Sequence, residues 1–270
     1  MDVLDQHGSG ETGKSLETVL NDGYQFDLGK YINEGFKLFG GDAGIYIAYT
    51  IVYFIIAGVT SSIPIVGWLA SLFIGPPLLA GWYLYARNQK KGFSKSFGNF
   101  FEAFKIQWMQ LVLQSLISAI FVGIAVSIVV LPFFISMIVD LIAHAKESQP
   151  VTDPEEMQEL LLSMLTGKVI LGIVLAALVG AMVSVLYVLA PMFIVFRGMG
   201  FWEAMEASRK VVTKNYGQFL LFMIILIVIG IVGFMMCCVG LLAAIPVIYL
   251  AIYSSFEDIL GSGDEPIVVN

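Results

Sequence analysis

Four long stretches of the chain are almost entirely apolar and carry no charged residue. They cover residues 43–86, 106–139, 169–196 and 215–256. An apolar run of about 18 residues is long enough to cross the hydrocarbon core of a bilayer as a helix. The first and last stretches have about twice that length, so each predicts a helical hairpin. The pattern therefore predicts six transmembrane helices, at residues 43–62, 65–86, 106–130, 169–196, 216–237 and 240–256.

Polar segments divide the rest of the chain. Residues 1–25 are polar and acidic and predict a flexible tail, and residues 261–270 form a second short tail. Residues 26–260 then form the membrane domain, with an excursion at residues 131–168 on one side of the bilayer. The composition agrees, because 58% of the residues are hydrophobic and only 13% are charged. We expect an all-α, polytopic integral membrane protein.

The basic residues indicate how the six spans are oriented. Cytoplasmic connections carry more Lys and Arg than outer ones, and an even number of spans places both termini on one side. Only Lys146 and Lys168 fall on the side of the excursion. The other side carries Lys14, Lys30, Lys37, Arg87, Lys90, Lys91, Lys95, Lys105, Arg197, Arg209, Lys210 and Lys214. This asymmetry predicts a bacterial cytoplasmic membrane protein with both termini in the cytoplasm.

A short motif occurs three times, and each copy reads acid, small residue, variable residue, base. The copies are Glu34-Gly35-Phe36-Lys37, Glu102-Ala103-Phe104-Lys105 and Glu206-Ala207-Ser208-Arg209. Each precedes an odd-numbered span, and the even-numbered span that follows contains proline, at Pro76-Pro77, Pro191 and Pro246. We interpret the chain as three repeats of an amphipathic helix and a helical hairpin. The amphipathic helices are expected on the inner leaflet, with their apolar faces toward lipid.

The segment from Gly8 to Ser15 reads GSGETGKS and matches the phosphate-binding pattern G-x-x-x-x-G-K-[ST]. Such a loop needs a buried strand before it and a helix after it, so that backbone amides converge on the phosphates. Only seven residues, mostly polar, precede the match, and the first span begins about thirty residues after it. We therefore predict no nucleotide binding, and the composition indicates no nucleic-acid partner and no cofactor.

Ionisable residues inside a membrane usually mark a functional pathway, and this chain has few. Asp140, His144 and Glu147 follow a helical i, i+4, i+7 spacing near the outer surface. A carboxylate, an imidazole and a second carboxylate on one face can ligate a divalent metal. The simpler interpretation, which we favour, is a polar helix end that leaves the membrane. The sequence predicts no catalytic residue.

Two other patterns predict contacts between helices. Gln107, Gln110, Gln114 and Ser118 share a face of the third span and can bond neighbouring helices. In the fourth span, small residues recur every four positions and allow close helix approach, either within the monomer or between copies. These small residues are Gly172, Ala176, Gly180 and Ser184.

The outer excursion contains an amphipathic segment. Thr152-Asp153-Pro154 is a helix start, and the next residues carry an apolar stripe. The stripe consists of Met157, Leu160, Leu161 and Met164. An apolar stripe needs a cover, which is either the chain's own third span or a protein partner.

The last third of the chain resembles a known group of proteins. The segment from Leu189 to Ile259 begins LAPMFIVFRGMGFWEAMEASRKVVTKNYGQF and ends IPVIYLAIYSSFEDI. It is similar to the membrane domain of bacterial glycerophosphoryl diester phosphodiesterases and of related bacterial integral membrane families. The resemblance implies the membrane fold. In those enzymes catalysis belongs to a separate soluble barrel domain, so the resemblance carries no catalytic residue over to this chain.

These observations favour a non-enzymatic scaffold or accessory subunit of a membrane complex. Its partners would be membrane lipids and a protein bound at the outer excursion or at the amphipathic helices. A transporter or lipid-handling protein is the alternative, in which the proline-bearing spans surround a cavity. An intramembrane enzyme, with Asp140, His144 and Glu147 as its first candidates, is a third hypothesis.

Overall fold

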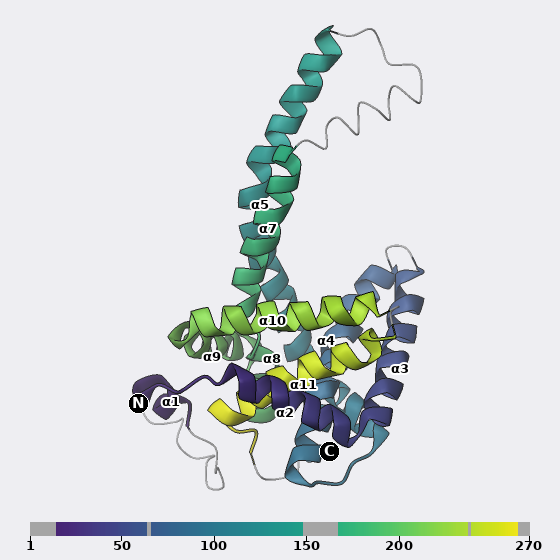
Figure 1. Cartoon of the computed structure of the whole chain (residues 1–270), viewed down its shortest axis with the longest axis vertical. Coiled ribbons are helices and arrows are strands. Elements are labelled where there is room, and N and C mark those ends of the chain that lie inside the picture. The colour runs from purple at the N-terminus through teal and green to yellow at the C-terminus, as the bar shows by residue number, and fades with distance from the viewer. Residues whose placement is uncertain (1–14, 64–65, 148–166, 237–238, 264–270) are drawn as a thin grey trace. The chain divides into compact units, whose positions relative to one another are not determined.

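The computed structural model describes residues 15–63, 66–147, 167–236 and 239–263, and helices account for nearly all of them (Figure 1). No strand occurs in these ranges. The elements are α1 (Leu16–Asp22), α2 (Leu28–Gly41), α3 (Ala43–Ser61), α4 (Val66–Lys91), η1 (Phe97–Phe104), α5 (Trp108–Glu147), α7 (Gly167–Val185), α8 (Ala190–Arg197), α9 (Phe201–Lys214), α10 (Tyr216–Met235) and α11 (Leu241–Ile259).

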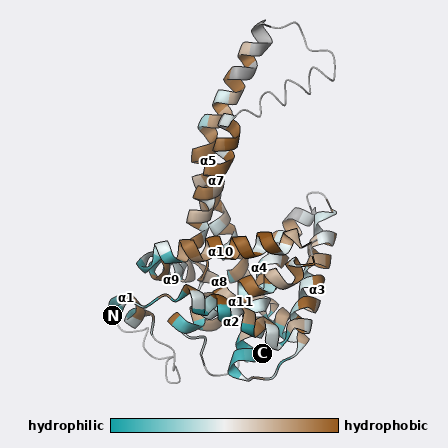
Figure 2. Ribbon diagram, viewed as in Figure 1, coloured by the Kyte–Doolittle hydropathy of each residue, from teal (hydrophilic) through white to brown (hydrophobic). Residues whose placement is uncertain are grey.

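Six of the described helical segments are long and apolar enough to cross a membrane. They are Ala43–Ser61, Leu69–Lys91, Trp108–Val139, Val169–Arg197, Tyr216–Met235 and Leu241–Ile259. Figure 2 shows apolar residues along most of α5, α7 and α10, whereas α9 is more polar. The expected all-α fold with six membrane-spanning helices is confirmed.

Two prolines act differently from what the sequence suggested. The third span was expected to end near residue 130, but α5 continues through Pro132 to Glu147. Proline removes one backbone donor, and within an apolar helix its neighbours can compensate for that loss. The fourth span was expected to be continuous, but turns at residues 186–189 separate α7 from α8. Pro191 lies in the first turn of α8, where a missing N–H costs least.

The chain forms two compact units. Residues 1–116 and 185–270 form what we call the main unit, and residues 117–184 form the hairpin unit. The main unit is centred on α11. In an apolar stretch of 18 residues of this helix, 61% of the residues are buried. The hairpin unit consists of parts of α5 and α7, together with residues outside the described ranges.

In the main unit, α2 lies alongside α11 (Figure 1). Tyr31, Gly35 and Leu38 are the buried residues of α2. A Cβ atom added at Gly35 would lie 2.9 Å from the backbone nitrogen of Ala251 and 3.0 Å from the carbonyl oxygen of Val247, so the two helices are nearly in backbone contact. The expectation that this apolar face points toward lipid is therefore wrong, because α11 covers it.

Stacked aromatic rings join α3, α4 and η1. The Phe100 ring lies between Tyr49, with ring centroids 3.9 Å apart, and Tyr85, at 4.5 Å. Trp82 stacks on Tyr249 of α11 at 4.7 Å. At Gly81 an added Cβ would lie 2.2 Å from the carbonyl oxygen of Phe100, so η1 packs directly on the backbone of α4.

The three amphipathic elements pack in a cyclic order. Each lies on the even-numbered span of the preceding repeat: η1 on α4, α9 on α8, and α2 of the first repeat on α11 of the third. The small residue of each motif is buried, at Gly35, Ala103 and Ala207. The threefold motif thus has a packing reason, since a small side chain lets each element approach its span closely.

In the hairpin unit, the small residues of α7 face α5. Gly172, Ala176 and Gly180 are buried, whereas Ser184 is exposed. An added Cβ would lie 2.8 Å from the Phe133 ring at Gly172, and 3.2 Å from a Val126 methyl group at Gly180. The Ser184 hydroxyl donates to the carbonyl oxygen of Gly180 at 2.8 Å. The small residues therefore pack within this chain.

Candidate functional site

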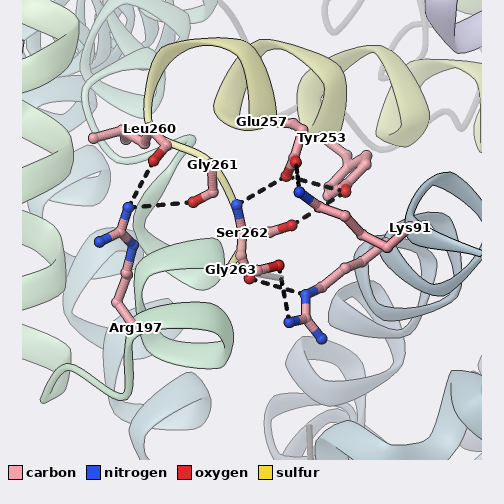
Figure 3. Close-up of polar contacts among 9 residues, drawn as sticks. Lys91, Arg197, Tyr253, Glu257, Leu260, Gly261, Ser262 and Gly263 are labelled. Carbon is pink, nitrogen blue, oxygen red and sulfur yellow. Dashed lines mark hydrogen bonds and ion pairs between the residues drawn. The ribbon is translucent and has the colours of Figure 1, made fainter. Parts of the chain in front are cut away.

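A largely buried polar network joins the ends of the even-numbered spans. We call it the polar node, and it consists of Arg87, Lys91, Arg197, Tyr253, Glu257 and the backbone of residues 260–263 (Figure 3). Its side chains come from α4, α8 and α11. The turn after α11 contains Gly261 and Gly263 at φ of 75° and 77°, a conformation that glycine adopts readily.

Arg87 holds the end of this turn. Its side chain projects from α4, and the residue is only 3% exposed. The Nε–H donates to the carbonyl oxygen of Ser262 at 2.9 Å, and an Nη2–H donates to that of Gly263 at 3.2 Å. Its guanidinium also lies 5.4 Å from the Phe93 ring and 5.7 Å from the Phe196 ring. Aromatic faces and backbone carbonyls thus replace water around this buried cation.

Arg197 holds the start of the same turn. It is the last residue of α8, and its Nη2 donates to the carbonyl oxygens of Leu260 at 2.6 Å and Gly261 at 3.3 Å. Carbonyl groups at a helix C-terminus lack partners within the helix and carry partial negative charge. Two arginines from two other spans bond carbonyl groups of the turn that follows α11, at the negative end of this helix.

Glu257 supplies the node's carboxylate from within α11. Lys91 forms an ion pair with it at 2.7 Å, and the backbone N–H of Ser262 donates to the same carboxylate at 2.9 Å. The Tyr253 hydroxyl donates to Glu257 at 3.2 Å. The node therefore contains one ion pair and two arginines held by backbone carbonyls, and it binds the ends of α4, α8 and α11 to one turn.

Three polar contacts link the repeats around the same end of the main unit. In each, the residue just before an odd-numbered span contacts the segment that leads into the next amphipathic element. These clasps join Asp42 to Lys95 at 2.6 Å, Gln107 to the Gly198 carbonyl at 3.0 Å and Asn215 to the Tyr24 carbonyl at 3.0 Å. The last clasp connects the third repeat to the first, so the polar contacts follow the same cycle as the packing.

A buried serine bridges the break in the fourth span. Ser208 of α9 is fully buried, and its hydroxyl donates to the carbonyl oxygen of Leu186 at 2.7 Å. The Ser208 hydroxyl oxygen in turn accepts the backbone N–H of Leu189 at 3.2 Å. An interrupted helix leaves backbone groups that lipid cannot satisfy. One hydroxyl serves a donor and an acceptor at the break, which explains why the variable position of the third motif is a serine.

Tyr24 and Glu206 are ionisable groups outside the spans whose pKa values are shifted. Burial raises the pKa of Tyr24 to about 12, and its hydroxyl donates to the carbonyl oxygen of Val211 at 2.8 Å. The Arg209 guanidinium, 2.7 Å away, lowers the pKa of Glu206. The Tyr24 contact adds a second bond to the clasp between the first and third repeats.

The predicted site residues fall in different places. Gln107 and Gln110 bond the α8–α9 connection, since the Gln110 side-chain oxygen accepts the Phe201 N–H at 2.8 Å, which confirms the predicted contacts. Gln107 does not share the face of the span, because it lies just before α5 at a φ of 45°. Asp140, His144 and Glu147 belong to α5, but their side chains lie outside the described residues. The stripe at Met157, Leu160, Leu161 and Met164 also lies outside them.

The P-loop-like match ends in a helix cap. Its last residue, Ser15, is the N-cap of α1, and its hydroxyl oxygen accepts the Thr18 N–H at 3.1 Å. The preceding residues lie outside the described ranges. The serine thus has a local structural role, and the absence of nucleotide binding stays a prediction.

Comparison of the chain with protein-family models, with curated proteins and with solved structures gave no match. The resemblance to the phosphodiesterase membrane domain stays a prediction.

The sequence analysis did not single out the polar node. Arg87 and Arg197 entered it only as basic residues that flank a span, and Glu257 only as the charge that ends the last apolar run. Their common signal is position, since each is the first charged residue after the proline of an even-numbered span.

Proposed function

We propose that this chain is a non-enzymatic scaffold or accessory subunit of the bacterial cytoplasmic membrane, with a protein partner at the outer end of α5. The observation that carries the proposal is the length of apolar surface that α5 exposes. Exposed apolar side chains run from Met109 to Ile142, which is about 50 Å at 1.5 Å per residue.

Lipid alone does not cover a helix face of this length. The hydrocarbon core is about 30 Å thick, and membrane helices tilt by at most about 40°. At that tilt the exposed face of α5 still spans about 38 Å along the bilayer normal. Phe134, Ile138 and Ile142 lie toward the outer end of this face and are 51%, 38% and 49% exposed. A protein partner there would shield from water the apolar surface that extends beyond the hydrocarbon core.

The polar node supports a structural rather than a catalytic role. Arg87, Arg197 and Glu257 contact the chain's own backbone, whereas catalytic groups face a substrate. The asymmetry of basic residues supports an orientation with this node on the cytoplasmic side. The exposed end of α5 would then face the outside, next in sequence to the predicted stripe at Met157, Leu160, Leu161 and Met164.

The orientation is tested by cysteine labelling. In a variant without Cys237 and Cys238, a cysteine at Ile142 should react with a membrane-impermeant maleimide added outside intact cells. A cysteine at Ser96 should react only after the cells are opened. The reverse result would overturn the proposed orientation.

The partner is tested by purification in native nanodiscs, followed by mass spectrometry of the proteins and lipids that co-purify. We expect a stoichiometric protein that is lost when Phe134, Ile138 and Ile142 are changed to serine. The matched control changes Ile224, Ile227 and Ile231 of α10, which are 49%, 52% and 53% exposed, to serine and should retain the partner. Retention by both variants would contradict the proposed surface.

The break between α7 and α8 favours transport or lipid handling as a second candidate. Discontinuous spans often surround substrate sites in transporters. Here the Ser208 hydroxyl already binds the Leu186 and Leu189 backbone groups, so the break is satisfied internally. A chain that purifies without a protein but with one enriched small molecule or lipid would favour this candidate over the accessory subunit.

A further inference from the structure

The second repeat differs from the other two in how its motif is paired. Lys37 lies 3.5 Å from Glu34, and Arg209 lies 2.7 Å from Glu206. The Glu102 carboxylate instead accepts a bond from the Asn99 side-chain amide at 2.7 Å. No ion pair of Lys105 occurs with any residue that the structure describes.

The acid and the base of this repeat both line one hollow. Its volume is 280 Å³, and it is lined by Ser96, Gly98, Asn99, Phe101, Glu102 and Lys105. Its wall therefore combines one cation, one anion, a hydroxyl, an amide and an aromatic ring. A ligand that satisfies all of these carries both a negative and a positive group.

The position of η1 indicates where such a ligand comes from. Phe100 packs on Gly81, ten residues before the end of α4 at Lys91, which is about 15 Å along the helix. Phe97 and Phe104, the first and last residues of η1, remain 39% and 36% exposed. Aromatic side chains at this distance from the charged end of a span favour the zone where headgroups meet acyl chains.

We propose that this hollow binds a phosphate ester with a nearby primary ammonium group, the chemistry of a phosphoethanolamine headgroup. Lys105 would bind the phosphate, and Glu102 and the Ser96 hydroxyl would accept N–H bonds from the ammonium. A trimethylated amine has no N–H to donate, and an anionic headgroup without an amine leaves Glu102 next to a negative charge. The site thus selects one headgroup class, and it does so independently of any protein partner at α5.

The test uses the full chain in nanodiscs that contain equal amounts of phosphatidylethanolamine, phosphatidylcholine and phosphatidylglycerol. Native mass spectrometry then counts the lipids retained as detergent is added. The wild type should retain phosphatidylethanolamine selectively. Lys105→Gln and Glu102→Gln should each lower this retention about tenfold, because each removes a charge-assisted bond.

Matched controls come from the first repeat, where the acid and base bind each other. Lys37→Gln and Glu34→Gln change the same charges and should leave retention unchanged. A loss of retention in these controls equal to that in the η1 variants would overturn the proposal. Equal retention of phosphatidylglycerol, or no effect of Glu102→Gln, would also overturn it, because either result indicates a site for any anion.

Free phosphoethanolamine distinguishes the two sources of this chemistry. If it displaces the retained lipid at millimolar concentration, the headgroup alone supplies the affinity, and a soluble phosphate ester of an amine can occupy the site. If it does not, the acyl chains also contribute, and the ligand is the lipid. Circular dichroism of each variant checks that the helices remain folded.

Discussion

The main unit and the hairpin unit join their helices by different means. In the main unit, stacked rings such as Phe100 between Tyr49 and Tyr85 combine with buried polar contacts such as Arg87 to Ser262. In the hairpin unit, the helices meet at Gly172, Ala176 and Gly180. Aromatic and polar contacts specify one arrangement, whereas small-residue packing in lipid gains little from apolar burial. We therefore expect the main unit to resist separation of its helices more strongly.

The sharpest way to break the main unit is Gly81→Ala. The new methyl group would lie 2.2 Å from the Phe100 carbonyl oxygen and 2.8 Å from the Tyr49 hydroxyl, so η1 must move away from α4. We expect a loss of at least about 3 kcal/mol in the free energy of unfolding, or no folded protein. Denaturant titration in detergent micelles, followed by tryptophan fluorescence, measures the change.

Gly75→Ala is the matched control in the same helix. A Cβ at Gly75 has no atom within 4 Å, so the substitution should be neutral or stabilise α4 by up to about 1 kcal/mol. Equal stability of the two variants would show that η1 does not pack on the backbone of α4.

Ser208→Ala removes one polar contact of the main unit without adding bulk. It leaves the Leu186 carbonyl and the Leu189 N–H without this buried partner, and we expect a loss of about 2 kcal/mol in the free energy of unfolding. The same titration measures it. Thr213→Ala is the control, because that exposed hydroxyl bonds only to carbonyls of its own helix, and it should cost less than about 0.5 kcal/mol. Similar losses for both variants would show that the Ser208 hydroxyl does not stabilise the break between α7 and α8.

Gly172→Ala tests the hairpin unit. Its methyl group would lie 2.8 Å from the Phe133 ring, and we expect a cost of about 1 kcal/mol because the two helices can separate slightly in lipid. Spin labels at Ile128 and Leu178, both exposed, should report a longer distance between α5 and α7.

Two further variants check this interpretation. Gly123→Ala, on the open face of α5, should leave the distance unchanged. Phe133→Leu in combination with Gly172→Ala should bring the distance back, because the smaller side chain makes room for the methyl group. A distance that does not change in Gly172→Ala would mean that the small residues do not set the approach of the two helices.

Charge spacing was enough to predict the spans, but not where backbone contacts form. Span boundaries at Ala43 and Tyr216 agree with the structure, since a change from polar to apolar residues is a local property. Whether a helix continues through a proline is not a local property. Pro132 lies inside α5, whereas Pro191 follows a break, so proline is compatible with both a continuous and an interrupted span. The backbone partners of Arg87 and Arg197 lie 175 and 63 residues further along the chain, so no pattern around either arginine reveals them.

The threefold repeat was predicted from the sequence, but the packing partners of its helices were not. The motif at Glu34, Glu102 and Glu206 was visible, and so was its small second residue. The amphipathic faces were assigned to lipid because a single sequence does not show which span lies beside each helix. The structure shows that Gly35 packs on α11, the span furthest away in sequence.

The smallest expected effect concerns the clasp between the first and third repeats, and it depends on pH. Burial raises the pKa of Tyr24 to about 12, above the value of about 10 for an exposed phenol. Below pH 10 the phenol is protonated in both the folded and unfolded states, and its bond to the Val211 carbonyl contributes fully. Between about pH 10 and 12 the unfolded state loses its proton first, so this contribution falls as the pH rises. Tyr24→Phe should therefore cost about 1 kcal/mol at pH 8, and the difference from wild type should fall to zero between about pH 10 and 12 and then change sign. Because the other tyrosines titrate in both proteins, a difference that stays constant from pH 8 to 12 would show that the Tyr24 hydroxyl is not a buried donor.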